Sequence, residues 1–219
     1  MPQYLSTSTK QKISHMRIFI FGENGFTNLT LASSLSMLGL DVIGEVDNDA
    51  VALNQITHHC PDVAVLNMEF GHIKAYELAK TLRKRFPSLG IVISAKSDDL
   101  RFYEIDPKDL PKGILIVRIA KHSDLDHLKD AIYLAPSQTH VQSKDHPFTK
   151  LSDEQIRTLI LMCHGKANSE IARERFVSEK SVEQMLARTA ITLGVHYDRK
   201  QNQRVRLTNS VYELINGER

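Results

Sequence analysis

The chain has few cysteines and no long apolar run. Only Cys60 and Cys163 occur among its 219 residues, far apart and without the spacing of a metal site. We therefore expect both to be reduced thiols of a cytoplasmic protein. No apolar run approaches the roughly 20 residues that a bilayer-spanning helix needs. Residues 1–15 lack the apolar core of a secretory signal, and we expect them to form a polar, disordered arm.

The sequence also lacks the patterns that carry most catalytic and metal chemistry. It has no Gly-rich phosphate loop, no spacing typical of a nucleophile with its base, and no cluster of metal-ligating residues. The adjacent His58 and His59 face different directions on a helix, so they do not form a metal-binding pair. We therefore expect no enzymatic activity, no metal and no cofactor.

Charge is almost balanced over the whole chain, at +2, but it differs between the two parts. Residues 1–149 contain 16 Lys and Arg against 17 Asp and Glu, whereas residues 150–219 contain 12 against 9. The net charges are therefore −1 and +3. A mild positive excess in a short C-terminal segment fits a polyanionic partner.

The first part of the chain alternates strand-like and helix-like segments. Strongly apolar runs of strand length alternate with segments of helical periodicity, which predicts a doubly wound α/β domain with a five-stranded parallel sheet. Between the fourth and fifth runs, Pro107 and Pro111 limit any helix to about 97–105. The predicted strands are 17–22, 41–47, 62–67, 90–95 and 113–119, and the predicted helices are 26–39, 49–59, 75–87 and 123–135.

A polar segment, 136–149, reads as a linker to a second, all-α domain at 150–219. Ser152 and Gln155 have the spacing of a capping box at the start of its first helix. Two short helical segments follow at 168–176 and 178–194, joined by a tight turn. Three short helices in this order predict a helix-turn-helix domain.

Several of these stretches resemble a known family. "GKANSEIA", the "VSEKSV" turn and the "LGV" ending make residues 151–195 similar to the DNA-binding domain of LuxR/NarL-type regulators. "HHCPDVAVLN" and "LRKRFPSLGIVISA" make residues 16–135 similar to a response-regulator receiver domain. The chain therefore resembles an atypical NarL/FixJ-family response regulator.

The resemblance implies a phosphorylation site at the carboxyl ends of the strands. The family has an acidic pair after the first strand, where this chain has Gly22 and Glu23, and a phospho-accepting Asp where it has Asn67. The family's hydroxyl corresponds to Ser94 and its lysine to Lys121. An amide is not a nucleophilic carboxylate, and Mg²⁺ prefers charged oxygen ligands. We therefore predict a degenerate receiver in which Glu23 pairs with Lys121, unless Asn67 is an ordinary polar strand end.

The same resemblance implies that residues 179–188 form the helix that enters the major groove of DNA. The alternative is a solvated helix face in a protein-binding module. The basic segment 199–206 either extends the DNA surface or forms a loop before a last helix at 207–217. By resemblance, the phosphate contacts are Lys180, Ser181 and Arg188, and the residues positioned to read bases are Glu183, Gln184 and Ala187.

The sequence thus favours a sequence-specific DNA-binding transcription regulator whose pseudo-receiver is not switched by aspartyl phosphorylation. We expect a homodimer, with Phe102 and Tyr103 as contact residues unless they pack in the core. The rival hypothesis is an adaptor whose pseudo-receiver docks another regulator. A third is a small-ligand sensor that uses the cleft around Glu23, Asn67 and Ser94.

Overall fold

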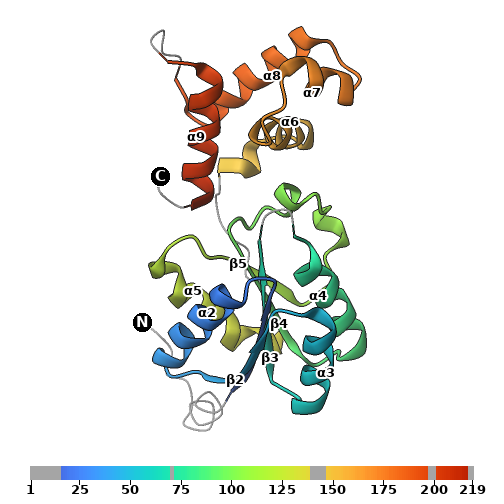
Figure 1. Ribbon diagram of the computed structural model, residues 1–219, viewed down its shortest axis with the longest axis vertical. Coiled ribbons are helices and arrows are strands. Elements are labelled where there is room, and N and C mark those ends of the chain that lie inside the picture. The colour runs from blue at the N-terminus through green and yellow to red at the C-terminus, as the bar shows by residue number, and fades with distance from the viewer. Residues whose placement is uncertain (1–15, 70–71, 139–146, 197–200, 217–219) are drawn as a thin grey trace. The chain divides into compact units, whose positions relative to one another are not determined.

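The computed structural model describes residues 16–69, 72–138, 147–196 and 201–216 (Figure 1). The predicted arm at 1–15 and most of the predicted linker lie outside these residues. Contacts divide the described residues into two units. The first runs to Asp98 and resumes at Lys108, and the second combines Asp99–Pro107 with the C-terminal residues from 147 onward.

The first unit is built on a parallel sheet of five strands in the order β2-β1-β3-β4-β5, which confirms the predicted sheet. The central strand β3 and its neighbour β4 are almost wholly buried, as their apolar sequences require. The strands are β1 (Arg17–Gly22), β2 (Asp41–Val46), β3 (Val63–Met68), β4 (Gly90–Ala95) and β5 (Ile114–Arg118).

Helices cover both faces of this sheet (Figure 1). α2 (Gly25–Met37) and α5 (Leu125–Leu134) lie on one face, and α3 (Asp49–His59) and α4 (Lys74–Arg85) lie on the other. The carboxyl ends of the strands therefore meet at one edge between the two helical layers, where doubly wound sheets place their sites.

Part of the apolar surface of α2 faces outward. The Phe26 and Leu29 side chains are 79% and 56% exposed. The buried residues are Asn28, Leu31 and Leu35. The helix has no charged residue, so its apolar periodicity is weak and does not define a face.

The second unit contains four α-helices among its described residues. The capping box is confirmed, because the Ser152 and Gln155 side chains each bond the other's backbone N–H. The last helix, α9, begins at Gln203, so the predicted start at 207 was too late. Residues 197–200, which precede it, lie outside the described residues. The helices are α6 (Asp153–Cys163), α7 (Asn168–Glu174), α8 (Glu179–Thr192) and α9 (Gln203–Asn216). No helix in the described ranges is both long enough and apolar enough to cross a membrane.

The first part of the segment after β4, Asp99–Pro107, belongs to this helical unit, and the chain returns to the first unit at Lys108. The segment forms the short turns η1 (Leu100–Tyr103) and η2 (Pro107–Asp109) instead of a regular helix, which agrees with the limit set by the prolines. η1 packs against α6, and the Phe102 ring lies 4.5 Å, centroid to centroid, from the fully buried ring of Phe148.

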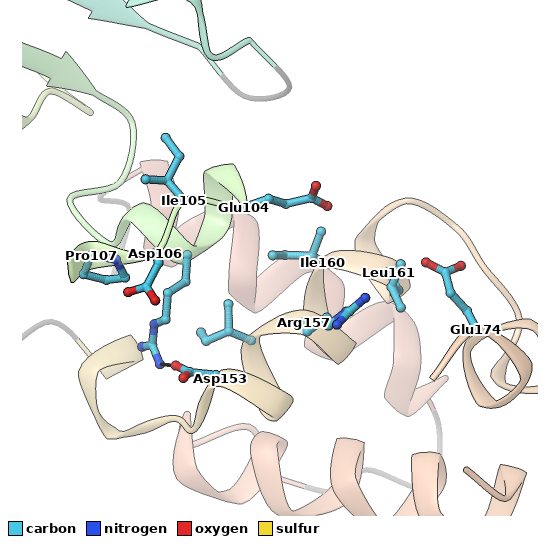
Figure 2. A pocket seen from close by; sticks show the side chains of 11 residues that line it. Glu104, Ile105, Asp106, Pro107, Asp153, Arg157, Ile160, Leu161 and Glu174 are labelled. Atoms are coloured by element: carbon cyan, nitrogen blue, oxygen red, sulfur yellow. Dashed lines mark hydrogen bonds and ion pairs between the residues drawn. The ribbon is translucent and has the colours of Figure 1, made fainter. Parts of the chain in front are cut away.

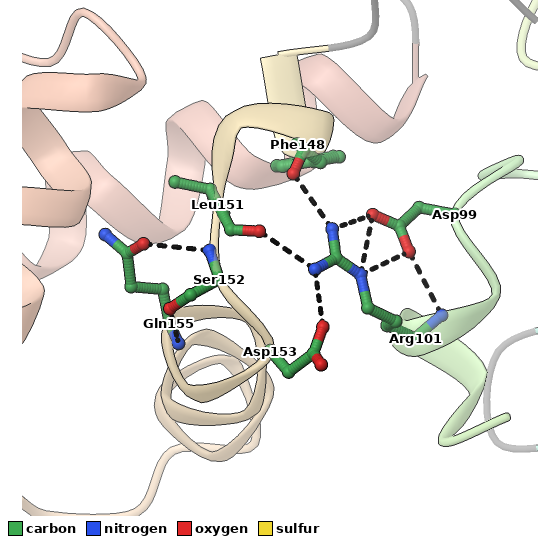
Figure 3. Close-up of polar contacts among 7 residues, drawn as sticks. All are labelled: Asp99, Arg101, Phe148, Leu151, Ser152, Asp153 and Gln155. Carbon is green, nitrogen blue, oxygen red and sulfur yellow. Dashed lines mark hydrogen bonds and ion pairs between the residues drawn. The ribbon is translucent and has the colours of Figure 1, made fainter. Parts of the chain in front are cut away.

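Arg101 fastens this segment to the start of α6 (Figure 3). Its guanidinium is bonded to the Asp99 carboxylate at 2.7 Å and to the Asp153 carboxylate at 2.8 Å. It also donates to the carbonyl oxygens of Phe148 and Leu151, at 3.0 and 2.8 Å. The hydrogen bond that Arg101 donates to Asp99 raises the pKa of Arg101 above its ordinary value, so the charge is permanent.

We expect Arg101→Ala to destabilise the second unit by about 2 kcal/mol, below the range for fully buried ion pairs because the side chain is partly exposed. The loss arises because the Asp99 side chain, only 8% exposed, is left without its cation. Hydrogen exchange of the α6 amides would measure the change. Asp153→Ala is the matched control, since that side chain is 87% exposed and its removal should have little effect. Equal effects of the two substitutions would contradict the role given to Asp99.

Candidate functional site

The register of the sheet brings three of the predicted site residues together. Gly22 pairs with Asn67 across β1 and β3, and Asn67 pairs with Ser94 across β3 and β4. The Ser94 hydroxyl is buried and donates to the Asn67 side-chain oxygen at 3.3 Å. Asn67 lies within β3, which ends one residue later, at Met68.

The predicted pair of Glu23 and Lys121 does not form in the structure. The Glu23 side chain is 14% exposed and lies against His72 Nδ1 and, at 3.4 Å, Lys74 Nζ. Both partners come from the entry to α4, which reaches the same edge of the sheet as the end of β1. The side chain of Lys121 is exposed, and its backbone N–H donates to Asp124 at 3.1 Å.

The space beside Gly22 is occupied by a residue that sequence reasoning did not identify. Asn28, fully buried on α2, donates from its amide to the carbonyl oxygens of Gly22 and Val46 at 2.7 and 3.0 Å. A Cβ at position 22 would lie 2.4 Å from the Asn28 amide oxygen and 2.8 Å from Asn67 Cβ. No side chain, acidic or otherwise, fits at Gly22 without movement of these neighbours.

The donor set at this edge does not fit the divalent cation that a receiver-like site implies. Among the predicted site residues Glu23 supplies the one carboxylate, and it already contacts two potentially cationic side chains. Asn67 contributes a neutral amide, whose nitrogen has no hydrogen-bond partner among the described residues. Mg²⁺ binds hard, charged oxygens in near-octahedral geometry, and these side chains do not supply them.

The predicted DNA-reading residues share one exposed face of α8. Their spacing along the chain follows the helical repeat, whereas the intervening residues Val182, Leu186, Thr189 and Ala190 are buried. Ser178 caps the helix by accepting the Ser181 N–H, and the two hydroxyls lie 2.7 Å apart. The exposed residues are Lys180, Ser181, Glu183, Gln184, Ala187 and Arg188.

A buried arginine links α8 to the other helices of its unit. The Arg175 side chain, 5% exposed, pairs with Glu154 and donates to the Thr158 hydroxyl and, at 3.1 Å, to the sulfur of Met185. Burial lowers the pKa of Arg175. No pattern in the sequence indicates this role, because a lone arginine at the end of α7 is typical of a surface residue.

Two arginines from the basic segment 199–206 are bonded within the second unit. Arg204 donates to the Asn168 side chain at 2.6 Å and to the Lys166 carbonyl. Arg206 donates to the His196 carbonyl at 2.7 Å. These contacts give both residues a structural role at the start of α9, and the question of DNA contact by this segment stays a prediction.

Phe102 and Tyr103, predicted as dimer contacts, are 8% and 4% exposed. In this structure both pack in the core of the second unit, which is the alternative that the sequence left open. A contact through them requires η1 to separate from α6. The dimer surface itself stays a prediction.

Comparison with known proteins gives the family. The chain is 31% identical over 170 residues to the DNA-binding transcriptional activator DevR/DosR of Mycobacterium tuberculosis, covering 71% of this chain and 77% of that protein. The chain belongs to the NarL/FixJ-type response regulators with a DNA-binding domain. The activator EvgA of Escherichia coli is a further relative, 21% identical over 180 residues, with 76% of this chain and 86% of EvgA covered.

Solved response-regulator structures show the same fold. The RcsB–DNA complex aligns with a TM-score of 0.52 at 18% identity, over 90% of this chain and 98% of the RcsB chain. A structure of two RcsB dimers bound to two parallel DNAs aligns with a TM-score of 0.51 at 20% identity, over the same shares. No protein-family model matches the sequence.

We expect Gly22→Ala to destabilise the first unit by about 1–3 kcal/mol, the usual range for overpacking. The cause is the 2.4 Å approach of the new Cβ to the Asn28 amide. Denaturant unfolding would measure the change. Asn28→Ala alone should cost about 2 kcal/mol, because two buried carbonyls lose their donor. The double variant should be less destabilised than the sum of both, and strict additivity would contradict the steric conflict.

Proposed function

We propose that the protein is a sequence-specific DNA-binding transcription regulator whose receiver-like domain is not switched by aspartyl phosphorylation. Its domains would be the receiver-like domain at 16–135, the linker at 136–149 and the DNA-binding domain at 150–219. DevR/DosR and EvgA are DNA-binding transcriptional activators, which supports DNA as the partner. We also propose that it acts as a homodimer, by analogy with the RcsB dimers bound to DNA.

The observation that carries the pseudo-receiver proposal is the packing around Gly22. The phospho-acceptor position holds the amide of Asn67, and the missing acid at Gly22 is replaced by the buried amide of Asn28. One substitution at position 67 therefore does not recover the site. Input would come instead from abundance, dimerisation or a bound partner.

An adaptor role is the second candidate, and the surface of α2 favours it. This helix exposes Phe26, Leu29 and Met37, the last at 88%, and carries no charge. The Ser33 hydroxyl donates back to the Leu29 carbonyl at 2.8 Å, which lowers the polarity of the same surface. Exposed apolar surfaces of this kind commonly mark protein contacts. DNA binding with a steep salt dependence would favour the regulator over the adaptor.

Incubation with a small phosphodonor and Mg²⁺ should leave the protein unmodified, because Asn67 offers no carboxylate nucleophile. Intact-mass spectrometry is the measurement. Asn67→Asp alone should also remain largely unmodified, since position 22 still lacks an acid. The matched variant combines Gly22→Asp, Asn28→Ala and Asn67→Asp, and it should gain a Mg²⁺-dependent adduct. A phosphate on residues 16–135 of the unmodified sequence would overturn the proposal.

The purified protein should bind its operator without a phosphodonor. Gln184→Ala should cost about 1–3 kcal/mol at the cognate site and little on unrelated DNA, if its amide reads a base. Lys180→Ala should instead weaken binding to all sequences and flatten the salt dependence, because its contact is with phosphate. Titrations at several salt concentrations separate these outcomes. Equal losses on every DNA for both variants would refute the assigned roles.

A further inference from the structure

A groove of about 590 Å³ lies within the second unit, between the segment after β4 and α6 (Figure 2). All its lining residues belong to this unit. Its floor is aliphatic, with Ile105, Ile156 and Leu161 buried and Ile160 partly exposed. Ile160 of α6 and Pro107 of the segment after β4 are the apolar lining residues that are not buried.

The rim of the groove is acidic. Its lining residues carry four carboxylates, those of Glu104, Asp106, Asp153 and Glu174, against the two guanidiniums of Arg101 and Arg157, an excess of two negative charges. In the view of Figure 2, Asp106 and Asp153 lie toward one end of the groove, Glu174 lies toward the other, and Glu104 lies between them. The Arg101 charge is already held by Asp99 and Asp153, and Glu174 pairs with Lys166.

Glu104 occupies a backbone conformation that does not suit it. Its φ of 58° and ψ of 27° lie in the left-handed region, where glycine is favoured and a side chain is strained. The residue ends η1 through its backbone N–H, a bond that glycine makes equally well. The Glu104 side chain is exposed at the rim of the groove, so its carboxylate is accessible to a partner.

The groove uses none of the predicted DNA-contacting residues. Its lining comes from the segment after β4, from α6 and from Glu174 of α7, and no α8 residue takes part. The acidic rim repels a phosphate backbone, so a nucleic acid is a poor occupant. The volume suits two or three side chains anchored by a larger partner.

We propose that this groove binds a basic amphipathic helix of a partner protein. Apolar side chains of that helix would pack on Ile160 and Pro107, and flanking lysines or arginines would pair with Glu104 and Asp106. Charge complementarity selects the partner, because an acidic rim around an aliphatic floor matches a cationic helix with an apolar stripe. The site does not depend on DNA binding, so either function can fail without the other.

The test uses the full-length protein and a labelled, short helical peptide of lysine and leucine, with a glutamate and leucine peptide as its counterpart. Fluorescence anisotropy should show binding of the lysine peptide alone, and amide NMR shifts should map to Ile105, Ile156 and Ile160. Glu104→Lys combined with Asp106→Lys should weaken binding about tenfold or more. Asp126→Lys with Asp130→Lys, on the exposed face of α5, changes the net charge equally and should leave binding unchanged.

Glu104→Gly separates function from folding. It should raise the thermal midpoint, because glycine relieves the strained backbone, and still weaken peptide binding several-fold. Ile160→Ala should weaken binding without changing charge. Equal losses in the groove pair and the α5 pair, undiminished binding by Glu104→Gly, or amide shifts confined to other surfaces would each overturn the proposal.

Discussion

The side-chain amide of Asn28 ties the carboxyl ends of β1 and β2 to α2, and the arrangement at this edge of the sheet depends on it. Its two hydrogen bonds fix how α2 is rotated about its axis. That rotation turns Phe26 and Leu29 outward, and it also fills the space where an acidic residue would stand. One buried polar group therefore accounts both for the filled space beside Gly22 and for the outward-facing Phe26 and Leu29.

Arg101 has a comparable role in the second unit. A guanidinium with several donors in one plane can bond two carboxylates and two carbonyls at once, which a lysine cannot do. Through these contacts the segment after β4 becomes part of the helical unit, and Phe102 and Phe148 pack behind it. The groove forms because the segment after β4 is held against α6. Its acidic rim therefore combines residues that are distant in sequence.

The two surfaces of the helical unit differ in charge. The exposed face of α8 mixes Lys180 and Arg188 with Glu183. The proposed attraction to DNA would therefore rest on few cations, and selective contacts would contribute much of the binding. The groove has an excess of negative charge, which suits it to a cationic protein segment. If both proposals hold, the helical unit would contact DNA and a second partner through different residues.

Local patterns in the sequence predicted most of the fold. Apolar runs marked all five strands, parallel pairing then placed Asn67 beside Ser94, and the spacing of Ser152 and Gln155 marked the start of α6. Helical periodicity also placed the exposed residues of α8 on one face. These features depend on neighbours within a few residues or on the alternation of strands and helices, both of which can be read directly from the chain.

Only the tertiary structure decided the rest. Glu23 contacts His72 and Lys74, Asn28 reaches two carbonyls on different strands, and Arg101 joins residues about fifty positions away. No local pattern marks these partners, because hydrogen bonds and ion pairs between distant segments depend on how the chain packs. The sequence by itself therefore determined the layers, the strands and the missing carboxylate. Packing decided which groups took its place.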